Sequence, residues 1–368
     1  MDNKIGAIWQ QLKKVAEVIK EENKTVNIIM NHSDPDMFGS AWALKHILRK
    51  LGIPNARIRI LATGEVGEKQ NQMIIDRFGL SQHIIKLADY WPKLNGNDLY
   101  AFVDASNPND GRLGEAYVGK MTPIIVIDHH TSPAPEETGD NFIWVQKGGA
   151  CATMLAKLLT EAGMMKFSKE EGDDLFVPVL LTLGIYGDTS GLLKCVTDDD
   201  VSAYISVYQL SNKQDLHVLT NIPDSEKFVE AENYARMHCI KDGLRLISCA
   251  GYLPSNRSQV WVSKFANMMV NWENITIAVV FAVDDDCRLV FSIRSTDLGL
   301  ITILDDVLHR KFQNSFGLKI SDDGMRLEGA AQIGMRIDLA ADVETREKHL
   351  EVVTTYMKKI FFGNDMRG

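Results

Sequence analysis

The stretch "IIVIDHH" (Ile124–His130) decides the fold, because it takes a buried strand directly into a cluster of polar side chains. Four apolar residues in a row, 124–127, predict a strand that is covered on both faces, as in a parallel sheet. An acid and two adjacent histidines follow at the carboxyl end of that strand. An Asp-His-His at one strand end is usually a solvated loop, so its meaning depends on partners elsewhere in the chain.

Outward from this strand, short apolar runs alternate with helical patterns through the first half of the chain. Strands are predicted over residues 26–30, 56–62, 84–87, 99–103 and 124–127. Helices are predicted over residues 39–51, 72–78, 150–162, 173–186 and 198–210. Buried strands that alternate with helices predict an α/β domain built on a doubly wound, mainly parallel sheet.

The last third of the chain predicts a second, smaller α/β domain. Two strands of a hairpin are expected over residues 276–283 and 288–294, followed by a helix over 301–312. Polar residues 211–223 predict a linker, and a helix over 226–239 follows it. We therefore divide the chain into an N-terminal domain (1–212), a linker with a connecting helix (213–240) and a C-terminal domain (241–368).

The composition excludes several classes of protein. The 368 residues are 45% hydrophobic and 24% charged, and no apolar run is long enough to span a membrane. The first 24 residues have the spacing of an amphipathic helix and not of a signal peptide. Five scattered cysteines show no metal-binding spacing, so we expect a cytoplasmic protein with reduced thiols. A formal net charge of −9 disfavours binding of long duplex DNA but is compatible with a small anionic substrate.

Acids and histidines follow four of the predicted strands or helices in the first half of the chain. They are His32, Asp34 and Asp36 in "NHSDPD", Asp104 in "VDAS", Asp128, His129 and His130 in "IDHH", and Asp188 in "GIYGDT". Taken one at a time, each group is explained by a helix cap or a turn. Because the carboxyl ends of parallel strands meet in one crevice, all four groups are expected to converge.

A pocket of this composition predicts bound metal ions. Several carboxylates side by side repel one another and take up protons unless cations neutralise them. Oxygen and imidazole ligands together suit Mn²⁺, Mg²⁺ or another first-row divalent ion. The ligands are numerous enough for two ions, which at about 3.5–4 Å from each other can clamp a phosphoryl group and generate a hydroxide nucleophile.

The ordered set of motifs resembles the DHH phosphoesterases, a family named for Asp-His-His. The four segments above match the four motifs of that family in order and approximate spacing, and "GGACATMLAKLL" (Gly148–Leu159) resembles the small-residue helix that follows the third motif. The segment "FSIRS" (Phe291–Ser295) resembles the associated C-terminal domain, DHHA1. The resemblance covers nearly the whole chain and includes single-strand exonucleases, nanoRNases and exopolyphosphatase-like relatives.

The resemblance implies a role for each residue of the site. His32, Asp34 and Asp104 would hold one metal ion, and Asp36, Asp104, His129 and Asp188 would hold the other, with Asp104 as the bridge. His130 would stabilise charge on the substrate phosphate. Asp128 would orient a ligand histidine by accepting its other N–H.

The C-terminal domain is where the sequence departs from the family. Members of the family grip substrate with a Gly-Gly-His loop, but the matching segment "RLEGAAQIGMRI" contains no histidine. The resemblance leaves Arg294 and Ser295 as substrate-binding residues, together with a glycine loop from Gly329 to Gly334 that would offer backbone N–H groups.

Three further segments are expected to be structural. The acid runs Asp198–Asp200 and Asp284–Asp286 predict solvated surface. The segment "SNRSQVWVSKF" (Ser255–Phe265) predicts a strand with an apolar face rather than a base-stacking site.

These features together predict a phosphoesterase that uses two divalent ions, with Mn²⁺ favoured and Mg²⁺ as the alternative. The expected substrate is a small phosphorylated molecule, with short oligonucleotides or dinucleotides favoured over polyphosphate or pyrophosphate. No membrane or long duplex DNA partner is expected, and a homodimer is left open. The alternative from another class is a protein that binds a nucleotide without cleaving it.

Overall fold

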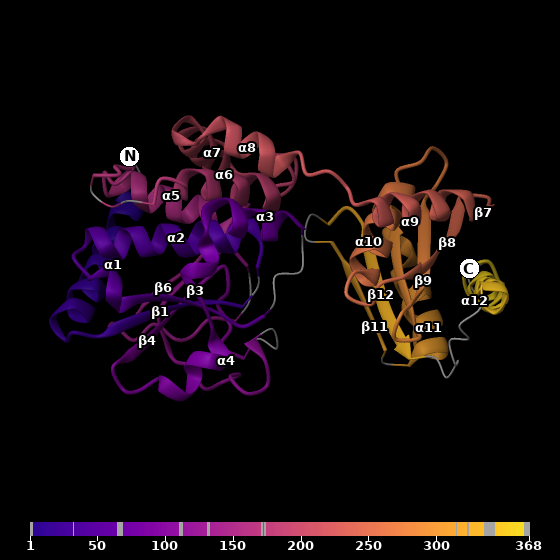
Figure 1. The fold of residues 1–368 in the computed structure, drawn as a ribbon, viewed down its shortest axis with the longest axis horizontal. Helices are drawn as coiled ribbons and strands as arrows, with labels where there is room; N and C mark the ends of the chain where they lie inside the picture. Colours follow the sequence, from indigo (N-terminus) through magenta and orange to yellow (C-terminus); the bar gives the residue numbers. More distant parts are fainter. Residues whose placement is uncertain are drawn as a thin grey trace. The chain divides into compact units, whose positions relative to one another are not determined.

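A computed structural model describes residues 3–31, 33–64, 69–109, 113–130, 133–170, 172, 174–313, 315–321, 324–334 and 343–363. The chain forms two compact units, Met1–Ile222 and Pro223–Gly368 (Figure 1). The division falls inside the segment 213–240, which the sequence marks as connecting. Among the described residues, none of the helices combines the length and the apolarity that a membrane span requires.

The first unit is built on a six-stranded sheet in which every neighbouring pair is parallel. The strand order is β3-β2-β1-β4-β5-β6, which confirms the predicted doubly wound, parallel sheet. The strands are β1 (Thr25–Met30), β2 (Ile58–Ala62), β3 (Ile84–Lys86), β4 (Asp98–Val103), β5 (Pro123–Asp128) and β6 (Phe142–Val145). The strand order reverses between β1 and β4, so the carboxyl ends of these two strands border a crevice.

Both faces of this sheet are buried, which explains why its strands are continuous apolar runs. Along β1, Ile28 and Met30 belong to one core, whereas Ile29 belongs to a second core with Phe102 and Val126. The first core also receives side chains from α1 (Asn3–Glu21), α2 (Pro35–Lys50), α5 (Cys151–Glu161) and α6 (Val177–Asp188).

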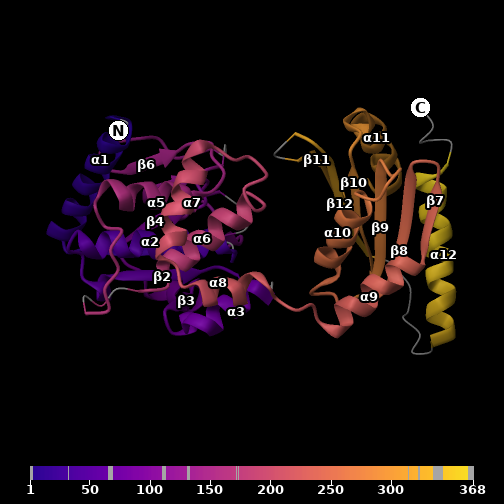
Figure 2. The ribbon, with the colours of Figure 1, turned by 90° about the horizontal axis from the view of Figure 1, so that it is seen from above.

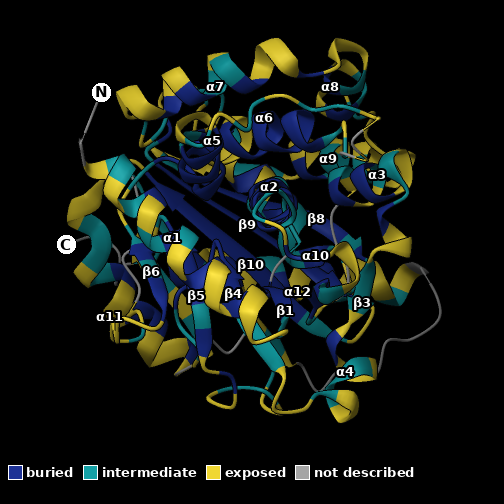
Figure 3. Ribbon diagram, turned by 90° about the vertical axis from the view of Figure 1, so that its left-hand side faces the viewer, coloured by how far each residue is buried: buried dark blue, intermediate teal, exposed yellow. Residues whose placement is uncertain are grey.

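The remaining helices of the first unit each contribute only one or two buried apolar side chains to these cores. They are α3 (Lys69–Phe78), α4 (Leu87–Tyr90), α7 (Asp198–Leu210) and α8 (Lys213–Thr220). Figure 3 shows α7 and α8 with exposed outer surfaces over α6, which is buried along most of its length.

Two differences from the predicted helices affect the site and the linker. α2 begins at Pro35 rather than at residue 39, because Asp34 accepts a hydrogen bond from the Met37 backbone N–H at 2.8 Å. Asp36 therefore lies inside the helix. Residues 213–220 were expected in a linker but form α8, whose only buried side chains are Leu216 and Leu219. Three apolar side chains in a polar segment, Leu216, Val218 and Leu219, are too few to reveal a helical period.

The second unit holds a mixed six-stranded sheet in the order β11-β12-β10-β9-β8-β7. Its strands are β7 (Cys239–Asp242), β8 (Arg245–Leu253), β9 (Ile277–Asp284), β10 (Arg288–Ser295), β11 (Phe316–Ile320) and β12 (Leu327–Gly334). Its helices are α9 (Glu226–Met237), α10 (Ser258–Met269), α11 (Ile301–Phe312) and α12 (Val343–Phe361). The predicted hairpin is present as β9 and β10, and Figure 2 shows α12 beside β8.

The prediction of a strand over Ser255–Phe265 is wrong, because this segment enters α10 at Ser258. The buried side chains of the helix are Ser258, Val262, Phe265, Ala266 and Met269, which recur at intervals of three and four residues. Most of this set lies at or beyond Phe265, so the short window that ends there does not show the helical period.

Candidate metal centre

Four of the predicted ligands converge in the first unit. Asp36 is the second residue of α2, Asp104 follows β4, His129 follows β5 and Asp188 ends α6. Their ligand atoms all lie within 4.8 Å of one another. His32 lies outside the described residues. Asp34 uses one carboxylate oxygen to cap α2, and its charge raises the pKa values of Asp36 and Asp104.

His129 turns its Nε2 edge toward this cluster. Its Nδ1 lies 3.0 Å from the Gly148 carbonyl oxygen, which can only accept, so Nδ1 carries a proton and Nε2 is the nitrogen that can bind a metal ion. Nε2 lies 3.2 Å from Asp104 Oδ1 and 3.3 Å from Asp188 Oδ2. Nε2 and Asp104 Oδ1 are both buried without a hydrogen-bond partner. Two buried ligand atoms without a hydrogen-bond partner, in a ring of carboxylates, fit a divalent cation.

The electrostatics of the cluster lead to the same conclusion. Burial, followed by the charges of Asp104 and Asp188, raises the pKa of Asp36 well above its usual range. Burial also raises the pKa of Asp104 to about 7, although the neighbouring His129 lowers it. For His129, burial lowers the pKa, but Asp104, Asp188 and Asp36 together raise it to about 12. The metal-free site therefore keeps protons that a bound cation would displace.

Metal binding is expected to release protons. The ligands must be deprotonated to coordinate an ion, so affinity for Mn²⁺ should rise as the pH rises through about 7. Calorimetric titrations on both sides of that pH, in two buffers with different ionisation enthalpies, would measure both the affinity and the proton release. Equal affinity at both pH values, with no proton release, would contradict this prediction.

Asp128 and His130 form a separate pair next to the cluster. Asp128 Oδ1 accepts from His130 Nδ1 at 2.8 Å and from the His130 backbone N–H at 3.1 Å. This corrects the expectation that Asp128 orients a histidine of the metal-ligand set, because the Gly148 carbonyl holds His129 instead. The His130 side chain is 46% exposed, so its Nε2 edge can meet a solute.

Backbone N–H groups hold the carboxylate of Asp36, another of the predicted metal ligands. The N–H groups of Cys151 and Ala152, at the start of α5, donate to the two Asp36 carboxylate oxygens, each at 2.7 Å. On the other side, α6 approaches so closely that a Cβ at Gly184 would lie 2.9 Å from the Asp36 Cα. Only glycine fits there, and the close approach brings the helix that ends at Asp188 against α2.

Several supporting residues were missed by the sequence analysis. They are Gly148, which positions His129, Cys151 and Ala152, which hold Asp36, and Asn71, whose side-chain amide donates to the Ser33 carbonyl. The small residues of "GGACA" were the one available signal. Backbone donors and carbonyls have no residue-specific signature, so that signal did not show which atoms they serve.

The acid runs expected on the surface are only partly exposed. Asp198, Asp199, Asp285 and Asp286 are exposed as predicted. Asp200 and Asp284 are fully buried, which contradicts that prediction. Asp284 is structural, because it accepts from the Arg288 backbone N–H at 2.9 Å and from Arg288 Nε at 2.8 Å within the β9–β10 turn.

In the second unit, Arg294 and Ser295 are engaged within their own domain. Arg294 is 8% exposed and donates to Asn267 Oδ1 and Ser292 Oγ, each at 2.8 Å, and to the Ile293 carbonyl at 2.9 Å. The Ser295 hydroxyl donates to the Thr276 carbonyl at 3.0 Å. Their substrate-binding role stays a prediction, and these contacts give both residues a structural role.

The prediction of a glycine loop is wrong, because Gly329 and Gly334 belong to strand β12. Gly329 pairs with Ile293 on β10 and with Leu318 on β11, and Gly334 pairs with Arg288. A Cβ at Gly329 would meet side-chain carbons of Leu318 and Ile293 at 3.2–3.3 Å. Strand pairing therefore occupies the backbone that was expected to bind an anion.

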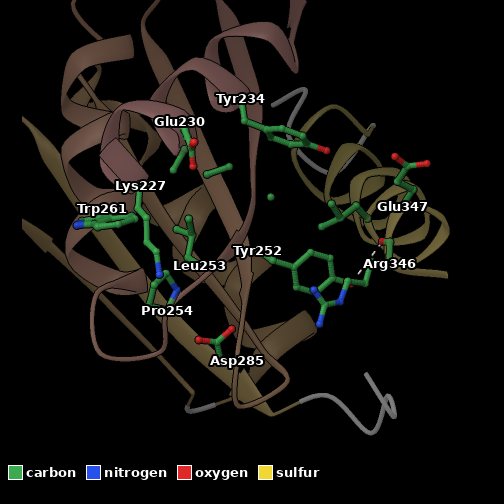
Figure 4. A pocket seen from close by; sticks show the side chains of 14 residues that line it. Lys227, Glu230, Tyr234, Tyr252, Leu253, Pro254, Trp261, Asp285, Arg346 and Glu347 are labelled. Atoms are coloured by element: carbon green, nitrogen blue, oxygen red, sulfur yellow. Dashed lines mark hydrogen bonds between the residues drawn. The ribbon is translucent and has the colours of Figure 1, made fainter. Parts of the chain in front are cut away.

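The second unit also contains a hollow of about 540 Å³ between α9, the end of β8 and α12 (Figure 4). The charged residues that line it are Lys227, Arg346, Glu230, Asp285 and Glu347. Arg346 lies over the ring of Tyr252, 5.4 Å from its centroid. Three acids against two bases give this hollow no excess of positive charge, so it does not replace the anion-binding loop expected in this domain.

Comparisons with known proteins address the fold and the family. Residues 27–185 match the model of the DHH family, N-terminal domain. An exopolyphosphatase-related protein from Bacteroides fragilis has a similar structure, with a TM-score of 0.64, 14% identity and coverage of 96% of this chain and 98% of that chain. A putative family II inorganic pyrophosphatase from Methanococcus jannaschii matches with a TM-score of 0.42, 13% identity and coverage of 89% and 99%. No curated protein sequence matches the chain.

Proposed function

We propose that this chain, whose residues 27–185 match the DHH family, N-terminal domain, is a phosphoesterase that hydrolyses short oligonucleotides or dinucleotides. The match supports a metal-dependent hydrolase of phosphoester bonds. The observation that carries the proposal is the cluster of Asp36, Asp104, His129 and Asp188, in which His129 Nε2 and Asp104 Oδ1 are buried without a hydrogen-bond partner.

Divalent ions, when bound, would supply positive charge for the phosphoryl oxygens and lower the pKa of a water molecule. The converging residues would hold them, together with Asp34 and the predicted ligand His32. We favour Mn²⁺ over Mg²⁺ because the site includes an imidazole. His130 would donate from Nε2 to a substrate phosphate, since Asp128 occupies its Nδ1.

Charge and composition support a small substrate. A net charge of −9 opposes the binding of a long polyanion, whereas a short phosphodiester needs only local cations. Polyphosphate or pyrophosphate is the second candidate, because the same ligand set would neutralise either. A protein that binds without cleaving has less support, because it would not need His130 held by a buried acid beside the carboxylates. The cysteines are free thiols, which supports a cytoplasmic location.

A substrate panel with Mn²⁺ tests the proposal. It includes RNA and DNA of two to five nucleotides, cyclic dinucleotides, nucleotide bisphosphates and polyphosphate. We expect the short oligonucleotides to be cleaved fastest, and chelator-treated protein and Asp188→Asn to be inactive controls. Faster release of phosphate from polyphosphate would favour the second candidate. Nucleotide binding without any turnover would favour the non-catalytic alternative.

A further inference from the structure

Asp200 is a fully buried acid of α7 that is not one of the converging ligands. Its Oδ2 accepts from the Thr197 backbone N–H at 2.8 Å and from the Thr197 hydroxyl at 2.6 Å, which caps α7. The same carboxylate also reaches α5. Oδ2 accepts from the Gly149 N–H at 3.2 Å, and Oδ1 accepts from the Thr153 hydroxyl at 2.5 Å.

Capping α7 does not explain this burial. A capping acid does its work at the surface, where its charge stays hydrated, and burying a carboxylate is unfavourable unless its hydrogen bonds are all made. The extra bonds of Asp200 go to Gly149, two residues before α5, and to Thr153 in the first turn of that helix. Ala150, at the N-cap position of α5, has no side-chain hydrogen bond to offer that turn. Asp200 therefore supplies contacts that α5 cannot make locally.

The turn that Asp200 binds is the common support of two candidate metal ligands. The Gly148 carbonyl holds His129 Nδ1 at 3.0 Å. Three residues further on, the N–H groups of Cys151 and Ala152 hold the Asp36 carboxylate. A displacement of Gly148–Ala152 would thus turn the His129 ring and loosen Asp36 at the same time.

This turn fits tightly between α7 and the end of α6. A Cβ added to Gly149 would lie 2.6 Å from Asp200 Oδ2 and 2.7 Å from the Thr189 methyl carbon. Thr189 directly follows the ligand Asp188. The backbone of Gly149 is therefore enclosed between Asp200 and Thr189. Asp200 also holds it with a hydrogen bond.

We propose that Asp200 is a positioning residue for the metal centre, which fixes the Gly148–Ala152 turn and through it the orientation of His129 and Asp36. The inference rests on the proposed function only in assuming that these ligands bind metal. Asparagine cannot replace Asp200, because an amide has one accepting oxygen. Its NH₂ group would face either the Thr153 hydroxyl or the three donors at Oδ2.

The main experiment compares Asp200→Asn with Asp199→Asn in the full chain. Asp199 is the preceding residue, is exposed and pairs with Lys157. We expect Asp200→Asn to weaken Mn²⁺ binding by about 10–100-fold, the usual effect of losing a residue that orients a ligand, and Asp199→Asn to change it little. In metal-free protein, NMR of the imidazole nitrogens should show the hydrogen bond from His129 Nδ1–H to the Gly148 carbonyl weakened only in Asp200→Asn.

Two further variants separate positioning from helix capping and replace Asp200→Asn if that variant fails to fold. Thr153→Val removes the hydroxyl contact to α5 but keeps the α7 cap, so it should weaken Mn²⁺ binding. Thr197→Val weakens the cap but keeps both contacts to α5, so it should lower the Tm without changing metal affinity. Equal Mn²⁺ affinity in Thr153→Val and Thr197→Val, with an unchanged Nδ1–H signal of His129, would overturn the inference. If the wild-type protein binds no Mn²⁺, both the inference and the proposed function fail.

Discussion

Asp104→Asn is expected to lose Mn²⁺ binding and to reduce kcat/KM on the best substrate by at least about 10³-fold. Loss of one electrostatic group at the reacting centre costs about 10²–10³-fold, and Asp104 is also the predicted bridge between two ions. Its Oδ1 is buried, has no hydrogen-bond partner and lies 3.2 Å from His129 Nε2. An amide of the same shape keeps the packing but removes the negative charge.

The same variant should be at least as stable as the wild type when both are metal-free. Burial raises the pKa of Asp104 to about 7, from 3.8. The folded protein thus holds a proton that the unfolded chain has lost, so this group makes the metal-free fold less stable as the pH rises from about 4 to about 7. Asparagine removes that dependence.

Thermal unfolding with and without Mn²⁺ checks both parts of this prediction. Wild-type Tm should rise with added Mn²⁺, because a ligand that binds only the folded state stabilises it. Asp104→Asn should show no such rise, and Asp199→Asn, a charge change on the surface of the same unit, should behave as the wild type. A normal Mn²⁺-dependent rise in the Tm of Asp104→Asn would exclude Asp104 as a ligand.

The second large effect is expected when the two adjacent histidines are replaced. The two alanine variants should lose activity for different reasons. His129→Ala removes the imidazole whose Nε2 faces the carboxylates, so it should weaken metal binding, and excess Mn²⁺ should restore part of the activity. His130→Ala should keep the metal and lower kcat by about 10²–10³-fold, the effect of losing one donor to a developing negative charge. The half-exposed side chain of His130 and its bond to Asp128 are the reasons for this division.

Metal titration and steady-state kinetics on both variants measure the difference. Asp128→Asn is the matched control, because it alters the acceptor of His130 Nδ1 and leaves the Gly148 contact of His129 in place. It should retain its metal affinity and lose part of kcat. Equal loss of metal affinity in His129→Ala and His130→Ala would refute the division of labour between them.

The sequence alone was sufficient to predict the first domain and the centre of its site. Apolar runs that alternate with helices predict a buried parallel sheet, and such a sheet brings its strand ends together in one crevice. For that reason Asp104, His129 and Asp188 could be placed in one cluster before their positions were known. The two strands of the C-terminal hairpin were predictable from two largely apolar runs and the acidic turn between them.

Tertiary contacts decided what supports those ligands. Asp128 was expected to hold a metal-ligand histidine but holds His130, and His129 is held by a carbonyl of the segment before α5. Asp200 belongs to an acidic run that predicts solvated surface, yet it is buried because α5 offers it two donors. A hydrogen-bond partner 51 residues away is selected by the packing of helices, and no local pattern encodes it.

In the C-terminal domain, too, the roles of the predicted residues depend on tertiary contacts that the sequence pattern does not encode. Arg294 at a strand end and two nearby glycines have the composition of an anion-binding site, but the chain uses them inside its sheet. A guanidinium or a backbone N–H serves a substrate or a neighbouring strand equally well. The choice depends on which group lies within about 3 Å, and that distance is set only when the strands pair.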